Sequence, residues 1–111
     1  MRYNNRPKTA PDGKSFQSTL ECDRYQELLL LEKAGKIQNL QTQVPFRLDV
    51  GGVHVCKYYA DFVYDEAGRQ VVEDTKGNTV TTVYTMKKRL MKGVHGIDIK
   101  ETRRGQVSRL R

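Results

Sequence analysis

Residues 59–77 read YADFVYDEAGRQVVEDTKG and predict the centre of the fold. Two runs of β-branched and aromatic residues flank a polar segment, a pattern typical of antiparallel strands joined by a turn. We predict these strands over residues 53–64 and 69–76. Because alternate residues of a strand share a face, Asp74 and Lys76 point to the same side of the sheet.

The register of the two strands decides whether two aspartates can meet. With a loop over residues 65–68, Asp61 lies opposite Val72 and diagonal to Asp74. Diagonal neighbours lie about 7–8 Å apart at the backbone, so their carboxylates can converge on one divalent cation. A shift by one residue would move Asp61 to the other face of the sheet. A site on these strands therefore depends on this assumed register.

A helix is predicted on each side of the strands. The first runs from residue 15 or 18 to residue 34, and Gly35 supplies the left-handed residue that ends helices. Its apolar side chains at helical spacing are Phe16, Leu20, Leu28 and Leu31. A second helix is predicted over residues 79–92, where apolar residues alternate with basic ones.

Two further strands complete the predicted sheet. Residues 44–50 alternate in polarity, and Pro45 favours an edge position or the start of a strand. Gly51-Gly52 predicts a two-residue hairpin turn after it. Residues 97–101 alternate again. The order αβββαβ predicts an α/β fold, with a mixed central sheet flanked by helices.

The length of 111 residues suits one domain with a thin core. We predict a flexible basic arm over residues 1–14, one folded domain over 15–101, and a basic tail or final strand over 102–111. No run approaches the roughly 20 apolar residues of a membrane span, and the first residues lack the apolar run of a signal peptide. We therefore expect a cytoplasmic protein that does not contact a membrane.

Two cysteines, Cys22 and Cys56, are the only ones in the chain. They form no CxxC pair, and the two histidines do not lie at zinc-finger spacing from them. We predict two reduced thiols and no structural zinc site.

The net charge of +7 is unevenly distributed. Residues 1–20, 21–84 and 85–111 carry +3, −3 and +7, respectively. Basic ends can neutralise phosphates, and an acidic middle can hold a cation. This pattern favours a nucleic-acid-binding protein; the alternative is that the basic ends only keep the protein soluble.

Asp61, Asp74 and Lys76 form a minimum set for phosphodiester hydrolysis. Mg²⁺ takes oxygen ligands and needs only one or two carboxylates. A bound divalent cation lowers the pKa of water and neutralises charge on the phosphate, and a nearby lysine stabilises the transition state. The alternative is an exposed ion pair between Asp74 and Lys76, worth at most about 1 kcal/mol. Because aspartate is disfavoured in strands, its occurrence in such apolar runs favours the site.

The pattern of Asp61, a hairpin and Asp74-Thr75-Lys76 resembles the signature of the PD-(D/E)xK nuclease superfamily, with Ala60 in the place of its proline. The chain is also similar to a group of small phage and prophage proteins placed in that superfamily. The similar segments are Phe16-x-Ser18-x-x-Glu21, Gly35-x-Ile37, Gln43-x-x-Phe46, Tyr59-x-Asp61-Phe62 and Glu73-Asp74-x-Lys76-Gly77. The resemblance covers residues 15–100 and implies a restriction-endonuclease-like core.

The resemblance also implies roles for individual residues. Asp61, Asp74 and the Thr75 carbonyl would bind Mg²⁺ or Mn²⁺, and Lys76 would be the catalytic lysine. Glu21 matches the helix glutamate that completes such sites. Alternatively, Glu21 is part of a capping box that begins at Ser18.

A DNA-contacting surface is predicted on the second helix, where Tyr84, Lys87 and Lys88 share a face and Arg89 and Lys92 extend the positive charge. The alternative is a solvated amphipathic helix whose tyrosine packs on the sheet. Gln43 is a further candidate for contact with the substrate or the site, or simply a polar residue before a strand. Four arginines near the C-terminus form either a DNA-contacting arm or a tail; they are Arg103, Arg104, Arg109 and Arg111.

Together these features predict a divalent-metal-dependent endonuclease that hydrolyses DNA. Analogy with small members of the superfamily suggests a homodimer that acts on branched DNA, such as a Holliday junction, in phage DNA metabolism in the bacterial cytoplasm. One alternative is a non-catalytic nucleic-acid-binding module on the same scaffold. Another is a phage interaction protein whose acidic residues bind no metal.

Overall fold

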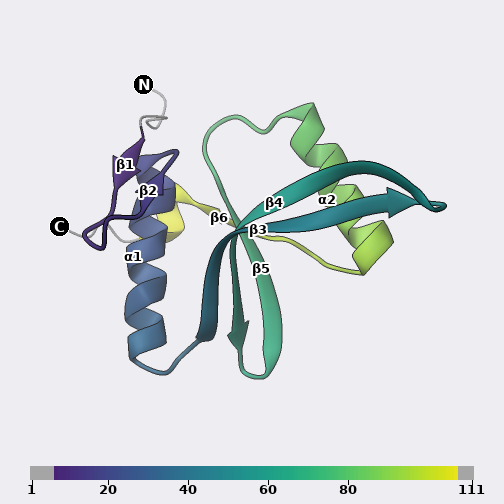
Figure 1. The fold of residues 1–111 in the computed structure, drawn as a ribbon. Coiled ribbons are helices and arrows are strands. Elements are labelled where there is room, and N and C mark those ends of the chain that lie inside the picture. Colours follow the sequence, from purple (N-terminus) through teal and green to yellow (C-terminus); the bar gives the residue numbers. More distant parts are fainter. Residues whose placement is uncertain (1–6, 108–111) are drawn as a thin grey trace.

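A computed structural model describes residues 7–107 of the 111-residue chain (Figure 1). In this part of the chain, two α-helices accompany a four-stranded mixed sheet and a small two-stranded sheet. The elements are β1 (Lys8–Thr9), β2 (Ser15–Phe16), α1 (Thr19–Lys33), β3 (Gln38–Val50), β4 (Val53–Glu66), β5 (Arg69–Lys76), α2 (Thr82–His95), β6 (Lys100–Arg103) and the 3₁₀ helix η1 (Arg104–Gln106). The predicted α/β class is confirmed, and so is the order of the six main elements.

The main sheet has the strand order β3-β4-β5-β6. The first two pairs are antiparallel and β5 pairs with β6 in parallel, as the crossover through α2 requires. Pro45 therefore lies on an edge strand, where its missing N–H costs no ladder hydrogen bond. Val50 pairs with Val53, which confirms the predicted turn at Gly51-Gly52.

The predicted register of β4 and β5 was wrong by two residues. Both strands continue to the turn, so Glu66 pairs with Arg69 and only Ala67 and Gly68 connect them. Both connecting residues have positive φ, 52° and 78°, the conformation whose twist suits a two-residue hairpin. Phe62 then pairs with Glu73, and the next position along brings Asp61 opposite Asp74. A shift of two keeps every side chain on its predicted face.

Helix α1 begins later than its apolar pattern suggests. Ser18 is the N-cap, and its hydroxyl accepts from the Glu21 N–H at 3.1 Å. Phe16 belongs to β2 and not to the helix, although it packs in the same core. Gly35 follows the C-cap at φ 75°, and the N–H of Lys36 bonds the Leu31 carbonyl at 2.9 Å. Gly35 therefore ends the helix as predicted.

The two helices pack in separate apolar clusters. The α1 cluster contains Ala10, Phe16, Cys22, Tyr25, Leu28, Ile37, Phe62 and Tyr64. The α2 cluster contains Leu48, Tyr58, Ala60, Val63, Val72, Tyr84, Met91 and Ile99. Both free cysteines match the prediction of reduced thiols, with Cys22 buried and Cys56 half-buried.

The β3–β4 hairpin changes direction between the two clusters. Ala60 and Phe62 are two residues apart, yet they pack in different clusters. Gln43 lies between their partners Val44 and Thr42, and its φ of 52° is unusual for a residue other than glycine. The outer half of the hairpin consequently runs beside α2 (Figure 1). Asp61 lies on β4 at this change of direction.

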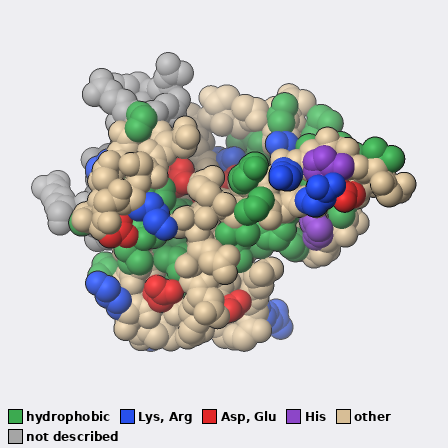
Figure 2. Space-filling model, viewed as in Figure 1, with side chains coloured by type: hydrophobic (Ala, Val, Ile, Leu, Met, Phe, Trp, Pro, Cys, Tyr) green, Lys and Arg blue, Asp and Glu red, His purple; other side chains and the backbone are tan. Residues whose placement is uncertain are grey.

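The outer end of the hairpin is fixed by polar contacts to α2. His95, at the end of α2, places its Nε2 2.7 Å from the Arg47 carbonyl on the β3 edge. Asp49 Oδ1 lies 2.7 Å from His54 Nδ1, and Asp49 Oδ2 lies 3.3 Å from Arg47 Nε. Figure 2 shows the histidines in purple among charged side chains at this end of the molecule. The first of these contacts joins the hairpin to α2, and the other two lie within the hairpin.

The ends of the domain differ from the prediction. Residues 8–16 contain the β1–β2 pair, with Ala10 buried in the α1 cluster, in place of a flexible arm. The last strand begins at Lys100, three residues later than predicted, and it places Thr102 in the interior; Val107, which follows η1, is also buried. Residues 1–6 and 108–111, including Arg109 and Arg111, lie outside the described part. No helix in the described residues is long and apolar enough to cross a membrane.

Candidate functional site

Strands β4 and β5 bring the two predicted aspartates together. The Asp61 Oδ2 atom accepts from the Thr75 N–H at 2.9 Å and from the Thr75 hydroxyl at 2.8 Å. Asp74 is buried, and its Oδ2 lies 2.9 Å from Lys76 Nζ. The three residues Asp61, Asp74 and Lys76 therefore form one cluster. Thr75 lies there too, through its two donors to Asp61.

Helix α1 adds a third acid to this cluster. Glu21 lies in its first turn and is 5% exposed. Its Oε2 accepts from Gln43 Nε2 at 2.9 Å, and the same amide group lies 3.3 Å from Asp61 Oδ1. Ser18 still caps the helix through the Glu21 N–H, so the backbone of Glu21 serves the cap while its carboxylate faces the aspartates. Gln43 is thus placed at the acids, as one of its predicted alternatives required.

The aromatic ring of Tyr84 packs against the Lys76 ammonium. Lys76 Nζ lies 3.3 Å from the centre of the Tyr84 ring, a cation–π contact. The ring is 8% exposed and its hydroxyl donates to Glu101 at 2.7 Å. The prediction that Tyr84 contacts phosphate is therefore corrected, because its place in the α2 cluster buries it. Its alternative, packing on the sheet, is what the structure has.

The acids of the cluster raise one another's pKa. Burial, followed by the charge of Asp61, raises the pKa of Asp74 to about 8, despite Lys76 beside it. Burial raises the pKa of Glu21 to about 7; the bond from Gln43 opposes this rise and the charge of Asp74 adds to it. Burial also raises the pKa of Asp61, with a contribution from Glu21. The cluster therefore keeps protons that exposed carboxyl groups release, because its single lysine would not neutralise three ionised acids.

The donors suit a hard divalent cation in kind, although they are not arranged as a complete set. Carboxylate oxygens are the ligands that Mg²⁺ and Mn²⁺ prefer, and Mg²⁺ needs only one or two of them. If Glu21, Asp61 and Asp74 were all ionised, their charge would exceed that of Lys76, and such a cation would compensate the excess. Within residues 7–107, however, no three His, Cys, Asp or Glu side chains are grouped closely enough to hold a metal ion together. The fit therefore rests on the Asp61–Asp74 pair.

A buried ion pair on the opposite face of β5 fixes the strand to α1. Glu73 is fully buried, and its carboxylate accepts from Arg24 at 2.6 and 2.9 Å and from the Tyr64 hydroxyl at 2.6 Å. Arg24 also binds Glu27. These contacts hold the pKa of Glu73 below its usual range, against its burial. The sequence analysis did not predict this network. The signal that could have revealed it is Glu73, an acid within the apolar run of a central strand.

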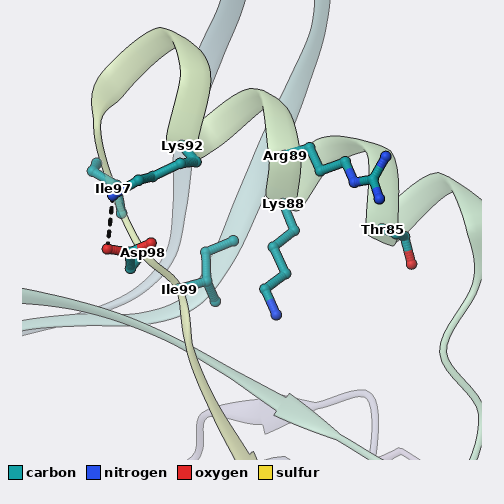
Figure 3. Close-up of a pocket in the computed structure, with 7 residues that line it drawn as sticks. All are labelled: Thr85, Lys88, Arg89, Lys92, Ile97, Asp98 and Ile99. Atoms are coloured by element: carbon teal, nitrogen blue, oxygen red, sulfur yellow. Dashed lines mark hydrogen bonds and ion pairs between the residues drawn. The ribbon is translucent and has the colours of Figure 1, made fainter.

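The basic residues of α2 are less available than predicted. Lys88 Nζ lies 3.1 Å from Glu101 Oε2, and Lys92 Nζ lies 2.9 Å from Asp98 Oδ2. Lys87 and Arg89 have no ion pair with the described residues. A pocket of about 460 Å³ lies between α2 and residues 97–99. In Figure 3, Lys92 reaches Asp98, while Lys88 and Arg89 point away from each other. Three cations and one acid line this pocket.

Two of the C-terminal arginines serve the fold. Arg104 binds the buried Asp23 of α1 at 3.0 Å, and Arg103 lies 3.3 Å from Glu101 Oε1. We predicted a DNA-contacting arm or a tail for these arginines, and neither alternative included an acidic partner within the fold. Asp23 also lies 3.7 Å from Lys8 of β1. Both β1 and η1 are thus joined to the start of α1.

The sequence was compared with known families, curated proteins and solved structures. A family profile described as "Protein of unknown function (DUF1064)" matches residues 1–106. The chain belongs to this family. The searches of curated proteins and of solved structures each gave no match. The family description assigns no activity, so a function has to be argued from the site.

Proposed function

We propose that the protein is a divalent-metal-dependent endonuclease that hydrolyses DNA phosphodiester bonds. One observation carries the proposal: Glu21, Asp61 and Asp74 converge from α1, β4 and β5 beside Lys76. Buried like charges are costly unless something uses or compensates them. The resemblance to PD-(D/E)xK nucleases, with its restriction-endonuclease-like core, supports the same reading.

In this proposal Asp61 and Asp74 would hold Mg²⁺ or Mn²⁺, with Glu21 and the Thr75 carbonyl as further donors. The bound cation would lower the pKa of a water molecule and neutralise charge on the phosphate. Thr75 orients Asp61 through its N–H and hydroxyl. The Tyr84 ring and Asp74 hold the Lys76 ammonium in place, where it can stabilise negative charge on the substrate.

The net charge of +7 supports a polyanionic substrate, and Lys87 and Arg89 are the α2 cations best placed to meet it. Lys88 and Lys92 already have acidic partners, so we assign them a smaller share of binding. Branched DNA, action as a homodimer and a role in phage DNA metabolism in the bacterial cytoplasm are further parts of this proposal. They rest on the superfamily analogy alone.

A non-catalytic DNA-binding module is the second candidate. It is favoured by the lack of a group of three metal-binding side chains in residues 7–107. It predicts salt-sensitive DNA binding without cleavage. An interaction protein with no metal would instead show neither cleavage nor stabilisation by divalent cations.

The test is cleavage of supercoiled plasmid and of a four-way junction with Mg²⁺, Mn²⁺ or EDTA. We expect wild type to cut only with metal, and Asp74→Asn and Lys76→Met to lose at least about a hundredfold in rate, about 2.7 kcal/mol of barrier. Asp65→Asn is the matched control, because Asp65 lies on the same strand as Asp61 but at its turn end. Tight DNA binding by folded wild type without cutting would favour the binding module.

A further inference from the structure

A buried phenol lies beside the two aspartates of the site. Tyr58 of β4 is 4% exposed, and its hydroxyl oxygen is buried. That hydroxyl makes no hydrogen bond of normal length and angle to residues 7–107. Folded proteins leave few buried side-chain donors without an acceptor, and the exceptions concentrate where a group has a function. Tyr58 is therefore an unexplained part of this region.

The ring of Tyr58 is held in position by its neighbours. Its centre lies 6.4 Å from the Tyr84 ring and 6.5 Å from the Phe46 ring. Tyr84 in turn lies beneath Lys76. The Tyr58 ring thus belongs to the group of aromatic rings next to Lys76. Its neighbours keep its hydroxyl from turning toward solvent.

Geometry links the Tyr58 ring to Asp74. The neighbouring Tyr84 ring has its centre 3.3 Å from Lys76 Nζ, and this ammonium lies 2.9 Å from Asp74 Oδ2. A phenol keeps its proton at neutral pH, so the Tyr58 hydroxyl can donate a hydrogen bond there. Asp74 has spare acceptor capacity, since Lys76 engages its Oδ2 atom.

We propose that Tyr58 is a positioning residue for Asp74: its hydroxyl donates to the Asp74 carboxylate and holds it toward Asp61. The terminal torsion of aspartate is broad, so the carboxylate can rotate to accept this bond. The inference rests on the proposed function, in which Asp74 binds the divalent cation. Partners that orient a metal-binding carboxylate strengthen binding without touching the metal.

The same strand carries a natural comparison. Tyr64, also on β4, donates to Glu73 on the other face of β5 at 2.6 Å. Each tyrosine thus approaches one of two consecutive acids of β5. Tyr64 belongs to the α1 network and Tyr58 to the site. Removing each hydroxyl separately should therefore affect different properties.

The experiment compares Tyr58→Phe with Tyr64→Phe. For Tyr58→Phe we expect Mn²⁺ affinity, measured by calorimetry, to fall about 10- to 100-fold. We expect kcat for DNA cleavage to fall with it, with KM for DNA unchanged. Tyr64→Phe should lower the urea midpoint but leave Mn²⁺ affinity unchanged. Wild-type Mn²⁺ affinity in Tyr58→Phe would overturn the inference.

A second measurement decides the inference even if the proposed function fails. If wild type neither binds Mn²⁺ nor cuts DNA, the nuclease proposal is wrong. The hydrogen bond from Tyr58 to Asp74 is then tested by a double-mutant cycle without metal. If Tyr58 bonds Asp74, the shift of urea midpoint in Tyr58→Phe with Asp74→Ala, which removes the acceptor, differs from the sum of the single shifts. Additive shifts would overturn the positioning role.

Discussion

At the residue scale, the site is defined by charges that are only partly compensated. Asp74 has Lys76, Asp61 has two donors from Thr75, and Glu21 has the amide of Gln43. These partners do not prevent a raised pKa at each acid. The folded chain therefore holds protons that the unfolded chain releases at lower pH. This difference makes stability depend on pH.

We predict that stability falls as pH rises from about 5 to about 8.5. A carboxyl group whose pKa is raised by folding contributes fully below its unfolded pKa near 4, and this contribution is lost as pH rises through about 7 for Glu21 and about 8 for Asp74. Urea unfolding followed by circular dichroism measures the slope. Asp74→Asn should flatten it, whereas Asp65→Asn should not. An equally steep slope in Asp74→Asn would contradict the raised pKa.

At the element scale, consecutive acids of β5 belong to different groups of side chains. Its Asp74 faces the site, while Glu73 faces α1 and binds Arg24. The helix carries both partners, since Glu21 and Arg24 are less than one turn apart. The α1–β5 ion pair thus sets the distance from Glu21 to the aspartates.

Breaking that ion pair should destabilise the fold. Arg24→Ala leaves Glu73 buried and uncompensated, so we expect a loss of about 3–5 kcal/mol in the free energy of unfolding, measured by urea denaturation. Arg69→Ala, at the exposed start of β5, is the control and should cost less than about 0.5 kcal/mol. Combining Arg24→Leu with Glu73→Leu should recover much of the loss, because no unpaired charge remains. A small effect of Arg24→Ala would show that water reaches Glu73.

At the scale of the whole molecule, the positive charge is spread over both ends of the chain but used differently. Arg103 and Arg104 bind acids of the fold, and so do Lys88 and Lys92. The number of basic residues, 20, therefore overstates the cations that a nucleic acid would meet. On α2, the cations without an acidic partner in residues 7–107 are Lys87 and Arg89.

We predict that DNA binding depends on these two cations. For Lys87→Ala with Arg89→Ala, the slope of log affinity against log salt should decrease by about 2, because each phosphate contact contributes about one. The control is Lys33→Ala with Lys36→Ala, which removes equal charge at the far end of α1. Fluorescence anisotropy at several salt concentrations measures both. Equal slopes for the two double variants would indicate that α2 is not the DNA-binding surface.

The order of elements, the α/β class and the strands that carry Asp61, Asp74 and Lys76 could all be predicted from local sequence patterns. Alternation, helical spacing and paired turn glycines are local signals, so they can be read without the fold. The register of β4 and β5 was missed because a two-residue and a four-residue loop are both compatible with Asp65 to Gly68. Only the tertiary structure showed that strand twist favours the shorter turn.

Which charged side chains are buried, and which partners they have, depends on the packing of the folded chain. Glu21, Asp23 and Arg24 lie consecutively or nearly so on α1, and their sequence resembles an ordinary polar first turn. Each is buried against a different distant segment: β3, η1 and β5, respectively. A side chain's partner across the fold depends on packing of segments far apart in the sequence. No local sequence pattern identifies such a partner. For this reason Tyr84 was assigned to DNA contact and Tyr58 was overlooked.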